Sequence, residues 1–132
     1  MTESLQNSNL GDTIDAFVTG YDLGDEGRGW TNQVGSLTFS VFLEDSEGNV
    51  KPHEIARVSN ISQELREKLT DSSDPENPVL KASWYGKCAT IDGQSVSARS
   101  YRLTHAVLVD WRPDRSADSC IVKEDFLKSM VL

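Results

Sequence analysis

Apolar and polar residues alternate in three stretches of the first half of the chain, and this period of two predicts β-strands. The clearest stretch is 35–44, where large apolar side chains occupy every second position. They are Leu37, Phe39, Val41 and Leu43. The stretches 13–21 and 53–59 show the same pattern over fewer residues. We therefore expect three strands, each with one face turned toward a core.

The period changes in residues 60–70, where apolar residues fall at i, i+4 and i+8, as on one stripe of a helix. These residues are Ile61, Leu65 and Leu69. Asn60 is the expected N-cap, with Gln63 three residues later as its capping-box partner. The Asp- and Pro-rich stretch 71–78 ends the predicted helix.

Two further strands are predicted at 79–90 and 99–111, and Asp92-Gly93 between them is a hairpin signal. One face of the last strand is expected to carry Tyr101, Leu103, His105, Val107 and Val109. The tail is expected to form a short helix through Val122, Phe126 and Met130.

The predicted order is three strands, one helix and two strands. This is the order of the OB-fold, an all-β, five-stranded Greek-key barrel with one helix bridging strands three and four. An SH3-like barrel ranks second, because it usually lacks the bridging helix. A length of 132 residues fits one domain. We expect residues 1–12 to be a flexible arm or linker, and residues 13–132 to be the OB-fold domain with a short C-terminal tail.

Charge is unevenly distributed along the chain. Residues 1–50 hold nine acids and one base, Arg28, and this difference of eight accounts for the whole net charge of −8. Residues 81–115 hold six bases and three acids. The net charge argues against a general nucleic-acid binder, but the second half is expected to present a locally positive surface.

The sequence also limits compartment and redox state. No run approaches the ~20 apolar residues of a membrane span, so no membrane partner is expected. The polar N-terminus has neither the basic start nor the apolar middle of a signal peptide. Cys88 and Cys120 have no paired spacing, so free, mostly buried thiols in a reducing cytoplasm are expected.

Few residues show the spacing of a catalytic or metal site. His53 and His105 lack cysteine or acidic companions at metal-ligand spacing, so no metal site is predicted. Trp84 and Trp111 are expected to be barrel aromatics. Trp30, in the glycine-dotted loop 22–33, is open to a base-stacking role.

The stretch VDWRPDR, residues 109–115, carries a charge cluster at a strand end: Arg112, Asp114 and Arg115. Such a cluster is either a solvated strand end or a site that grips an anion. The stretch 103–115 resembles the last motif of ATP-dependent DNA ligases, which ends in Arg-x-Asp-Lys.

The resemblance extends to other segments. DTIDAFVTGY (12–21), a glycine-bearing loop and GSLTFSVFLED (35–45) look like the entry to that family's OB domain. ARVSNISQELREKLT (56–70) looks like the strand-three-to-helix passage of the small bacteriophage ligases. Residues 12–120 are covered in the family's order.

The resemblance implies an OB domain or subunit that closes on a separate nucleotidyltransferase domain. Arg112 and Arg115 would bind the ATP pyrophosphate, and Asp114 would orient them. ATP and Mg²⁺ would be bound only through that partner domain. In a second pose another face would contact nicked duplex DNA, in replication or repair in a bacterial or phage-infected cell. The residues expected to contact DNA are Arg28, Trp30, Lys81, Lys87, Arg99 and Arg102.

The sequence also departs from the family. Arg115 stands where the family has lysine, and Thr104 and Val107 stand where arginine is frequent. The first loop, often basic in the family, is acidic here. The chain contains no Lys-x-Asp-Gly, the motif of the adenylated lysine, so it is not expected to ligate alone. Two alternatives stay open: a non-catalytic OB-fold module that binds nucleic acid, and a phage structural or adaptor protein.

Overall fold

The computed structural model describes residues 13–24, 33–74 and 76–131, and it is mostly β-structure with a few short helices. The predicted flexible arm, residues 1–12, lies outside the described residues. The elements in chain order are β1 (Ile14–Leu23), β2 (Val34–Glu44), β3 (Val50–Val58), α1 (Gln63–Leu69), β4 (Thr70–Asp71), β5 (Val79–Leu80), η3 (Ala82–Trp84), β6 (Cys88–Asp92), β7 (Ser95–Val96), β8 (Leu103–Thr104), β9 (Val107–Trp111), η4 (Ala117–Ser119), β10 (Ile121–Lys123) and α2 (Glu124–Ser129).

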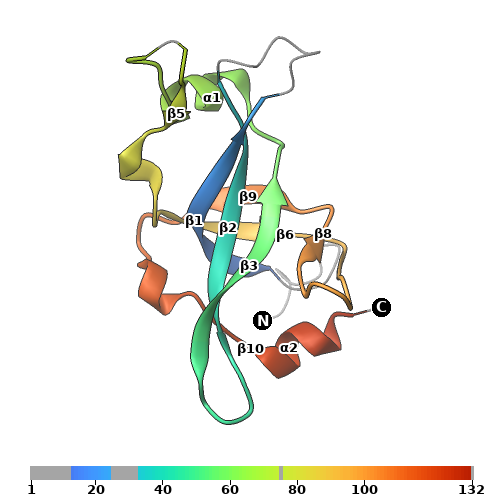
Figure 1. Ribbon diagram of the computed structural model, residues 1–132. Helices are drawn as coiled ribbons and strands as arrows, with labels where there is room; N and C mark the ends of the chain where they lie inside the picture. The colour runs from blue at the N-terminus through green and yellow to red at the C-terminus, as the bar shows by residue number, and fades with distance from the viewer. Residues whose placement is uncertain (1–12, 25–32, 75, 132) are drawn as a thin grey trace.

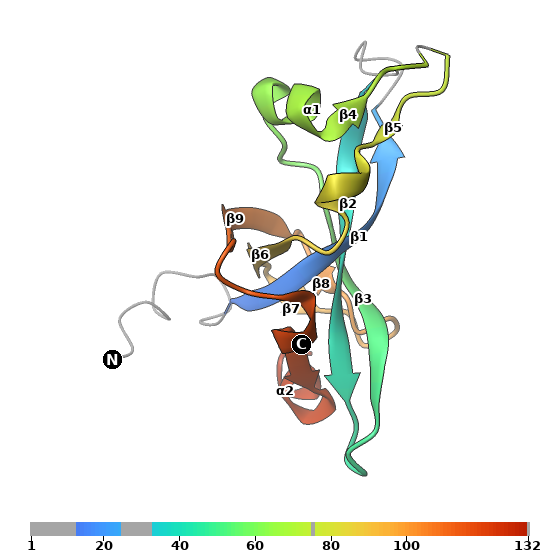
Figure 2. The same ribbon diagram turned by 90° about the vertical axis from the view of Figure 1, so that its left-hand side faces the viewer.

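One six-stranded sheet organises the molecule. Its order is β10-β2-β1-β6-β9, with β3 also paired to β2. β1 is shared between two neighbours: Ile14–Phe17 pairs with β6, and Phe17–Leu23 pairs with β2. β6 and β9 consequently run across the direction of β2 (Figure 1). α1, β4 and β5 lie toward one end of β2, and α2 lies nearer the β2–β3 hairpin (Figure 2).

The molecule is mostly β, as expected, but its sheet is not closed into a barrel, which corrects the expectation of a five-stranded barrel. Its outer strands β3 and β9 are not paired by backbone hydrogen bonds within the described residues. A side chain bridges them instead. Asn60, just after β3, accepts from the Leu108 N–H of β9 at 3.0 Å and donates to the Leu108 carbonyl at 3.4 Å.

The alternation in β2 correctly predicts its buried face: Leu37, Phe39 and Val41 are fully buried. The opposite face is covered in part as well, since Ser36 and Ser40 are buried. Ser40, which is buried there, shares a hydrogen bond of 2.8 Å with the Thr19 hydroxyl.

The bridging helix lies where the change of period predicts it, but its cap differs. The N-cap is Ser62, whose hydroxyl accepts from the Leu65 N–H at 3.1 Å. Asn60, the predicted cap, is engaged with β9 instead. Ile61 and Leu69 are buried, as the helical stripe requires.

Neither of the two later strands is continuous. The predicted strand 79–90 is divided into β5, the 3₁₀ turn η3 and β6, with Gly86 at φ +85° between η3 and β6. The predicted strand 99–111 is divided into β8 and β9 at His105, whose φ of +52° is left-handed and ends extended structure. Val107 and Val109, expected on the same strand face as Leu103, are 39% and 55% exposed, whereas Leu103 is buried.

The antiparallel pairing that the Asp92-Gly93 signal predicts between the strands 79–90 and 99–111 is present, as β6 with β9, but the connection is longer than a tight hairpin and contains β7 and β8. β7 pairs with β8. The predicted tail helix is present as α2, but it is shorter than expected, because Val122 belongs to β10, which pairs in parallel with β2. Within the described residues, no helix is long and apolar enough to cross a membrane.

Candidate functional site

The cluster Arg112–Arg115 forms a tight turn at the end of β9. The Arg112 N–H donates to the Cys88 carbonyl at 2.8 Å, and the Arg115 N–H donates to the Arg112 carbonyl at 3.2 Å. Pro113 occupies the second position of this turn, where its fixed φ is favoured. Because proline has no N–H, it also ends the pairing with β6.

Asp114 holds the guanidinium of Arg112 in a fixed plane. The Nε and Nη2 atoms of Arg112 donate to the two Asp114 carboxylate oxygens at 3.1 and 3.0 Å. This hydrogen-bonded pairing lowers the pKa of Asp114 and raises the pKa of Arg112. The Nη1 atom of Arg112 donates to the Thr90 hydroxyl of β6 at 3.4 Å.

Arg115 is held by a residue from the other end of the chain. Its Nη1 atom lies 2.9 Å from Asp15 Oδ2, and its Nε and Nη2 atoms donate to Ser119 at 3.3 and 3.1 Å. Asp15, on β1, also accepts from the Thr90 hydroxyl at 2.7 Å. The sequence analysis did not single out Asp15. Its only signal is a lone acid among the apolar residues of a strand.

An open pocket of about 520 Å³ adjoins this turn. The rings of Trp84 and Trp111 form one wall, with centroids 5.0 Å apart. The side chain of Lys87 lies over Trp84, with Nζ 5.4 Å from the ring centroid, in a cation–π contact. Lys87, Arg112 and Arg115 all line the same pocket, which therefore combines an aromatic wall with three cations.

Arg115 also lines a second, smaller pocket of about 370 Å³, together with Asp15, Cys120 and Lys123. Its guanidinium therefore borders both hollows. The side chains of Arg112 and Arg115 are each 36% exposed, so an anion from solution can reach both.

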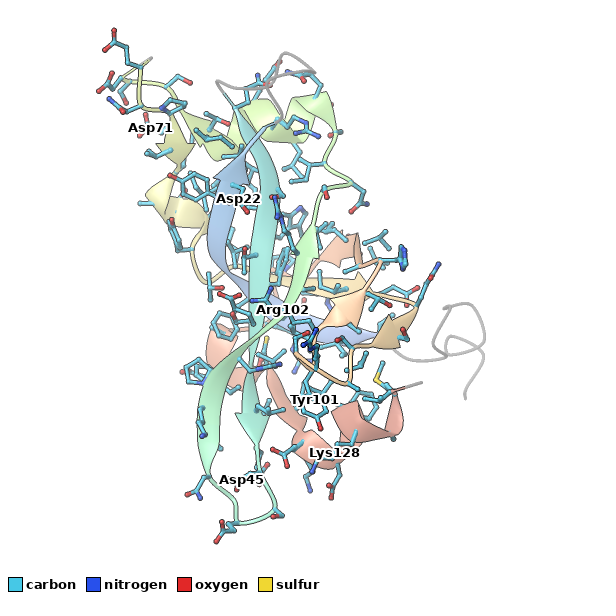
Figure 3. The ribbon with its side chains drawn as sticks, turned by 45° about the vertical axis from the view of Figure 1, so that its right-hand side comes forward. Asp22, Asp45, Asp71, Tyr101, Arg102 and Lys128 are labelled. Atoms are coloured by element: carbon cyan, nitrogen blue, oxygen red, sulfur yellow. The ribbon has the colours of Figure 1, made fainter. Side chains whose placement is uncertain are left out.

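The other predicted DNA contacts are dispersed. Lys81 lies near Asp71 of β4, whose pKa is lowered mainly by a hydrogen bond from Ser73 and slightly by Lys81. Arg99 lies in the turn between β7 and β8, and Arg102 forms an ion pair with Glu54 of β3. Figure 3 shows Arg102 beside β3, far from Asp71. Arg28 and Trp30 lie outside the described residues.

The structure therefore brings one of the predicted DNA contacts, Lys87, to the predicted phosphate clamp. Trp84 and Trp111, interpreted from the sequence as barrel aromatics, pack against the core and also line the pocket. Within the described residues, no group of three or more His, Cys, Asp or Glu side chains could hold a metal ion.

The site is nearly charge-balanced as it stands. Lys87, Arg112 and Arg115 are countered by Asp15 and Asp114. An incoming anion must therefore replace carboxylate contacts of the arginines. A phosphate oxygen can do so, because charge-assisted hydrogen bonds to a guanidinium are favourable with either kind of oxyanion.

No family model matches the chain, and no curated protein sequence matches it. Solved structures do. The ligase domain of LigD from M. tuberculosis is similar over 84% of this chain and 38% of its own, with 17% sequence identity and a TM-score of 0.55.

Two further structures are similar at lower scores. Mycobacterial DNA ligase D complexed with ATP is matched over 83% of this chain and 37% of its own, with 17% identity and a TM-score of 0.47. A Lig E DNA ligase is matched over 76% and 30%, with 15% identity and a TM-score of 0.45. The chain thus spans little more than a third of the LigD domain, and what it shares with that ligase domain is its fold.

Proposed function

We propose that this chain is the OB-type domain or subunit of an ATP-dependent DNA ligase. In this proposal it closes on a separate nucleotidyltransferase domain and contacts nicked duplex DNA. One observation carries the proposal: Lys87, Arg112 and Arg115 gather at one pocket of a chain whose fold is similar to a DNA ligase domain. The segment with the ligase-like motif is thus the segment that presents cations to solution.

Arg112 and Arg115 would bind the pyrophosphate portion of ATP, and ATP and Mg²⁺ would be held by the partner domain. As the pyrophosphate leaves, negative charge builds on its oxygens, and preorganised cations stabilise that charge. The role of Asp114 would be to fix the plane of Arg112 through the two hydrogen bonds described above. Asp15 would hold Arg115 until a phosphate takes over the contact.

The aromatic wall suggests how the same pocket would serve DNA in the second pose. Lys87 would contact a backbone phosphate. Trp84 and Trp111 would pack against the sugar or base edge of an end at the nick. Because the arginines are already paired with carboxylates and the net charge is −8, we expect binding to be weak.

Pyrophosphate titration of the isolated chain tests the clamp directly. We expect Arg112→Ala and Arg115→Ala each to weaken binding by about 10- to 100-fold, the value of one or two charged hydrogen bonds. Lys51→Ala, an equal change of charge in β3 outside this pocket, is the matched control and should change affinity little.

Nicked-duplex titration at rising salt tests the DNA contact. The logarithm of the binding constant should fall linearly with the logarithm of the salt concentration, by about 0.9 per phosphate contacted. Lys87→Ala should reduce that slope by about 1. Tight binding that ignores salt would contradict the proposal.

Adenylation separates the two roles. When the wild-type chain is added to a ligase nucleotidyltransferase domain, it should accelerate the adenylation of that domain by ATP. Arg112→Ala should remove most of this acceleration. Arg115→Lys should cost less than Arg115→Ala, because lysine keeps the charge. Sealing of a pre-adenylated nick has no pyrophosphate to hold, so it should be much less affected. If none of these steps changes, the arginines are a salt-bridged strand end, and a non-catalytic role becomes the better interpretation.

A further inference from the structure

The chain's two cysteines, Cys88 and Cys120, lie in contact in the fold, with their Sγ atoms 3.6 Å apart. Both are free thiols, and they are only 3% and 2% exposed. Cys88 begins β6, and Cys120 directly precedes β10. Both pack against Phe17 in a small apolar cluster separate from the main core.

A small movement of the two sulfur atoms would allow a disulfide bond to form. A disulfide places its sulfurs about 2.05 Å apart, so the two sulfurs must close by roughly 1.5 Å. The nearest polar groups of the two thiols are backbone carbonyls, and the charges of Arg115 and Asp15 act on Cys120 with opposite signs. Cys88 lies near the Gly86 carbonyl, and Cys120 lies near the Ser116 carbonyl.

Each cysteine lines a different hollow. Cys88 lines the pocket formed by Trp84 and Trp111, and Cys120 lines the smaller pocket beside Asp15. Burial raises the pKa of Cys120 to about 12, with the contact to Cys88 adding to the effect. Thiolate is therefore scarce at neutral pH, and exchange at this pair should be slow.

We propose that Cys88 and Cys120 form a reversible dithiol–disulfide pair, oxidised by a low-molecular-weight disulfide such as oxidised glutathione. One cysteine thiolate attacks a glutathione sulfur, the glutathione S–S bond breaks, and one glutathione thiolate leaves. The other cysteine thiolate then attacks the protein sulfur of this mixed disulfide and displaces the second glutathione. Two electrons pass from the cysteines to glutathione, and the two protons are taken up by the glutathione thiolates.

The cross-link would act on the turn that carries the arginines. The Arg112 N–H donates to the Cys88 carbonyl, and Arg115 donates to Ser119, the neighbour of Cys120. The disulfide would close a covalent ring that contains β9 and both arginines. By restricting the unfolded chain it should stabilise the protein. This inference does not depend on the proposed function.

The experiment brings the full chain to equilibrium with oxidised glutathione at about pH 8.5, where more thiolate is present. The sample is then quenched in acid, denatured and alkylated, and its intact mass is measured. We expect a monomer with no alkylated cysteine and a mass lower by about 2 Da, the two hydrogens lost. Reduction with dithiothreitol should restore two alkylated thiols, and the oxidised form should melt several degrees higher.

Cys88→Ala and Cys120→Ala are the matched variants, because a buried free cysteine packs as a small apolar residue. Each keeps one thiol, so oxidation should leave a glutathione adduct or a free thiol and should not raise Tm. Peptide mapping of the wild type gives a readout that does not depend on how the variants fold. It should yield one peptide pair joined through residues 88 and 120.

Three results would overturn the proposal. They are two alkylatable thiols after equilibration, disulfide-linked dimers as the only oxidised product, and a stable glutathione adduct on the wild type.

Discussion

Asp15 Oδ2 lies 2.9 Å from Arg115 Nη1, although the two residues come from opposite ends of the described chain. The Asp15 side chain is only 17% exposed, and Thr90 donates a hydrogen bond to its other oxygen. The carboxylate is thus fixed on the surface of β1 and β6. Arg115 is held where it borders both pockets. Any anion that binds Arg115 therefore competes with the carboxylate of Asp15.

Asp15→Asn should therefore strengthen anion binding. It removes the competing charge while the amide can still accept a hydrogen bond from Thr90. We expect affinity for pyrophosphate and nicked duplex to rise roughly three- to tenfold, which corresponds to about 1 kcal/mol of repulsion near a surface. Glu47→Gln makes the same change of charge in the β2–β3 turn. Equal gains for both variants would show that only net charge matters.

The carboxyl of Asp114 should titrate below its ordinary value of 3.8, because Arg112 is hydrogen-bonded to the ionised form. A group whose pKa is lowered by folding favours the folded state only while it is ionised. Its contribution is complete above about pH 3.8 and is lost as the pH falls through the lower folded pKa. NMR titration of the side-chain carbon should show this midpoint, and Arg112→Gln should return it toward 3.8. An unchanged midpoint in the variant would contradict the pairing.

Thr70 is expected to be a stability determinant at the junction of α1 and β4. Its hydroxyl accepts from the buried Val34 N–H at 3.0 Å and donates to the Arg66 carbonyl at 2.7 Å. Thr70→Val keeps the shape but leaves that N–H without this acceptor. The free energy of unfolding should fall by about 1–3 kcal/mol in urea titration. Thr70→Ser retains the hydroxyl and should cost clearly less; an equal loss would point to packing instead.

Gly35 is expected to tolerate no side chain. A Cβ atom there would lie 2.4 Å from the Cα of Gly24, which is backbone and cannot rotate away. Gly35→Ala should destabilise the protein by about 1–3 kcal/mol through the forced shift of β2. Gly20→Ala is the comparison, because its Cβ would meet Thr38 at an ordinary 3.5 Å. Similar melting temperatures for the two variants would refute the steric argument.

Local patterns in the sequence predicted the parts of the fold that local forces decide. The alternation around Leu37 to Val41 predicted β2, and the stripe from Ile61 to Leu69 predicted α1. Where the chain adopts an uncommon backbone conformation, the pattern failed. At His105 a left-handed residue interrupts the alternation, and no glycine or proline marks that position in the sequence.

The candidate site shows the same division. The turn at Arg112–Arg115 could be predicted from its proline and its charges. The partners could not, because Asp15, Thr90 and Lys87 reach this turn only through the pairing of β1, β6 and β9. The prediction of the helix N-cap was wrong for a related reason. Asn60 is a residue type that suits an N-cap, but its side-chain amide is hydrogen-bonded to Leu108, 48 residues away.

The two hydrogen bonds between the Asn60 side chain and the Leu108 backbone also bear on self-association of the protein. β9 is an outer strand with Val107 and Val109 exposed, which is the kind of edge that recruits a strand from another molecule. One primary amide occupies both the N–H and the C=O of Leu108, as a neighbouring strand would. At Leu108 the edge of β9 therefore offers an incoming strand no free N–H or C=O group. A single side chain thus takes the place of a neighbouring strand at this point of the edge, where it opposes pairing with another molecule.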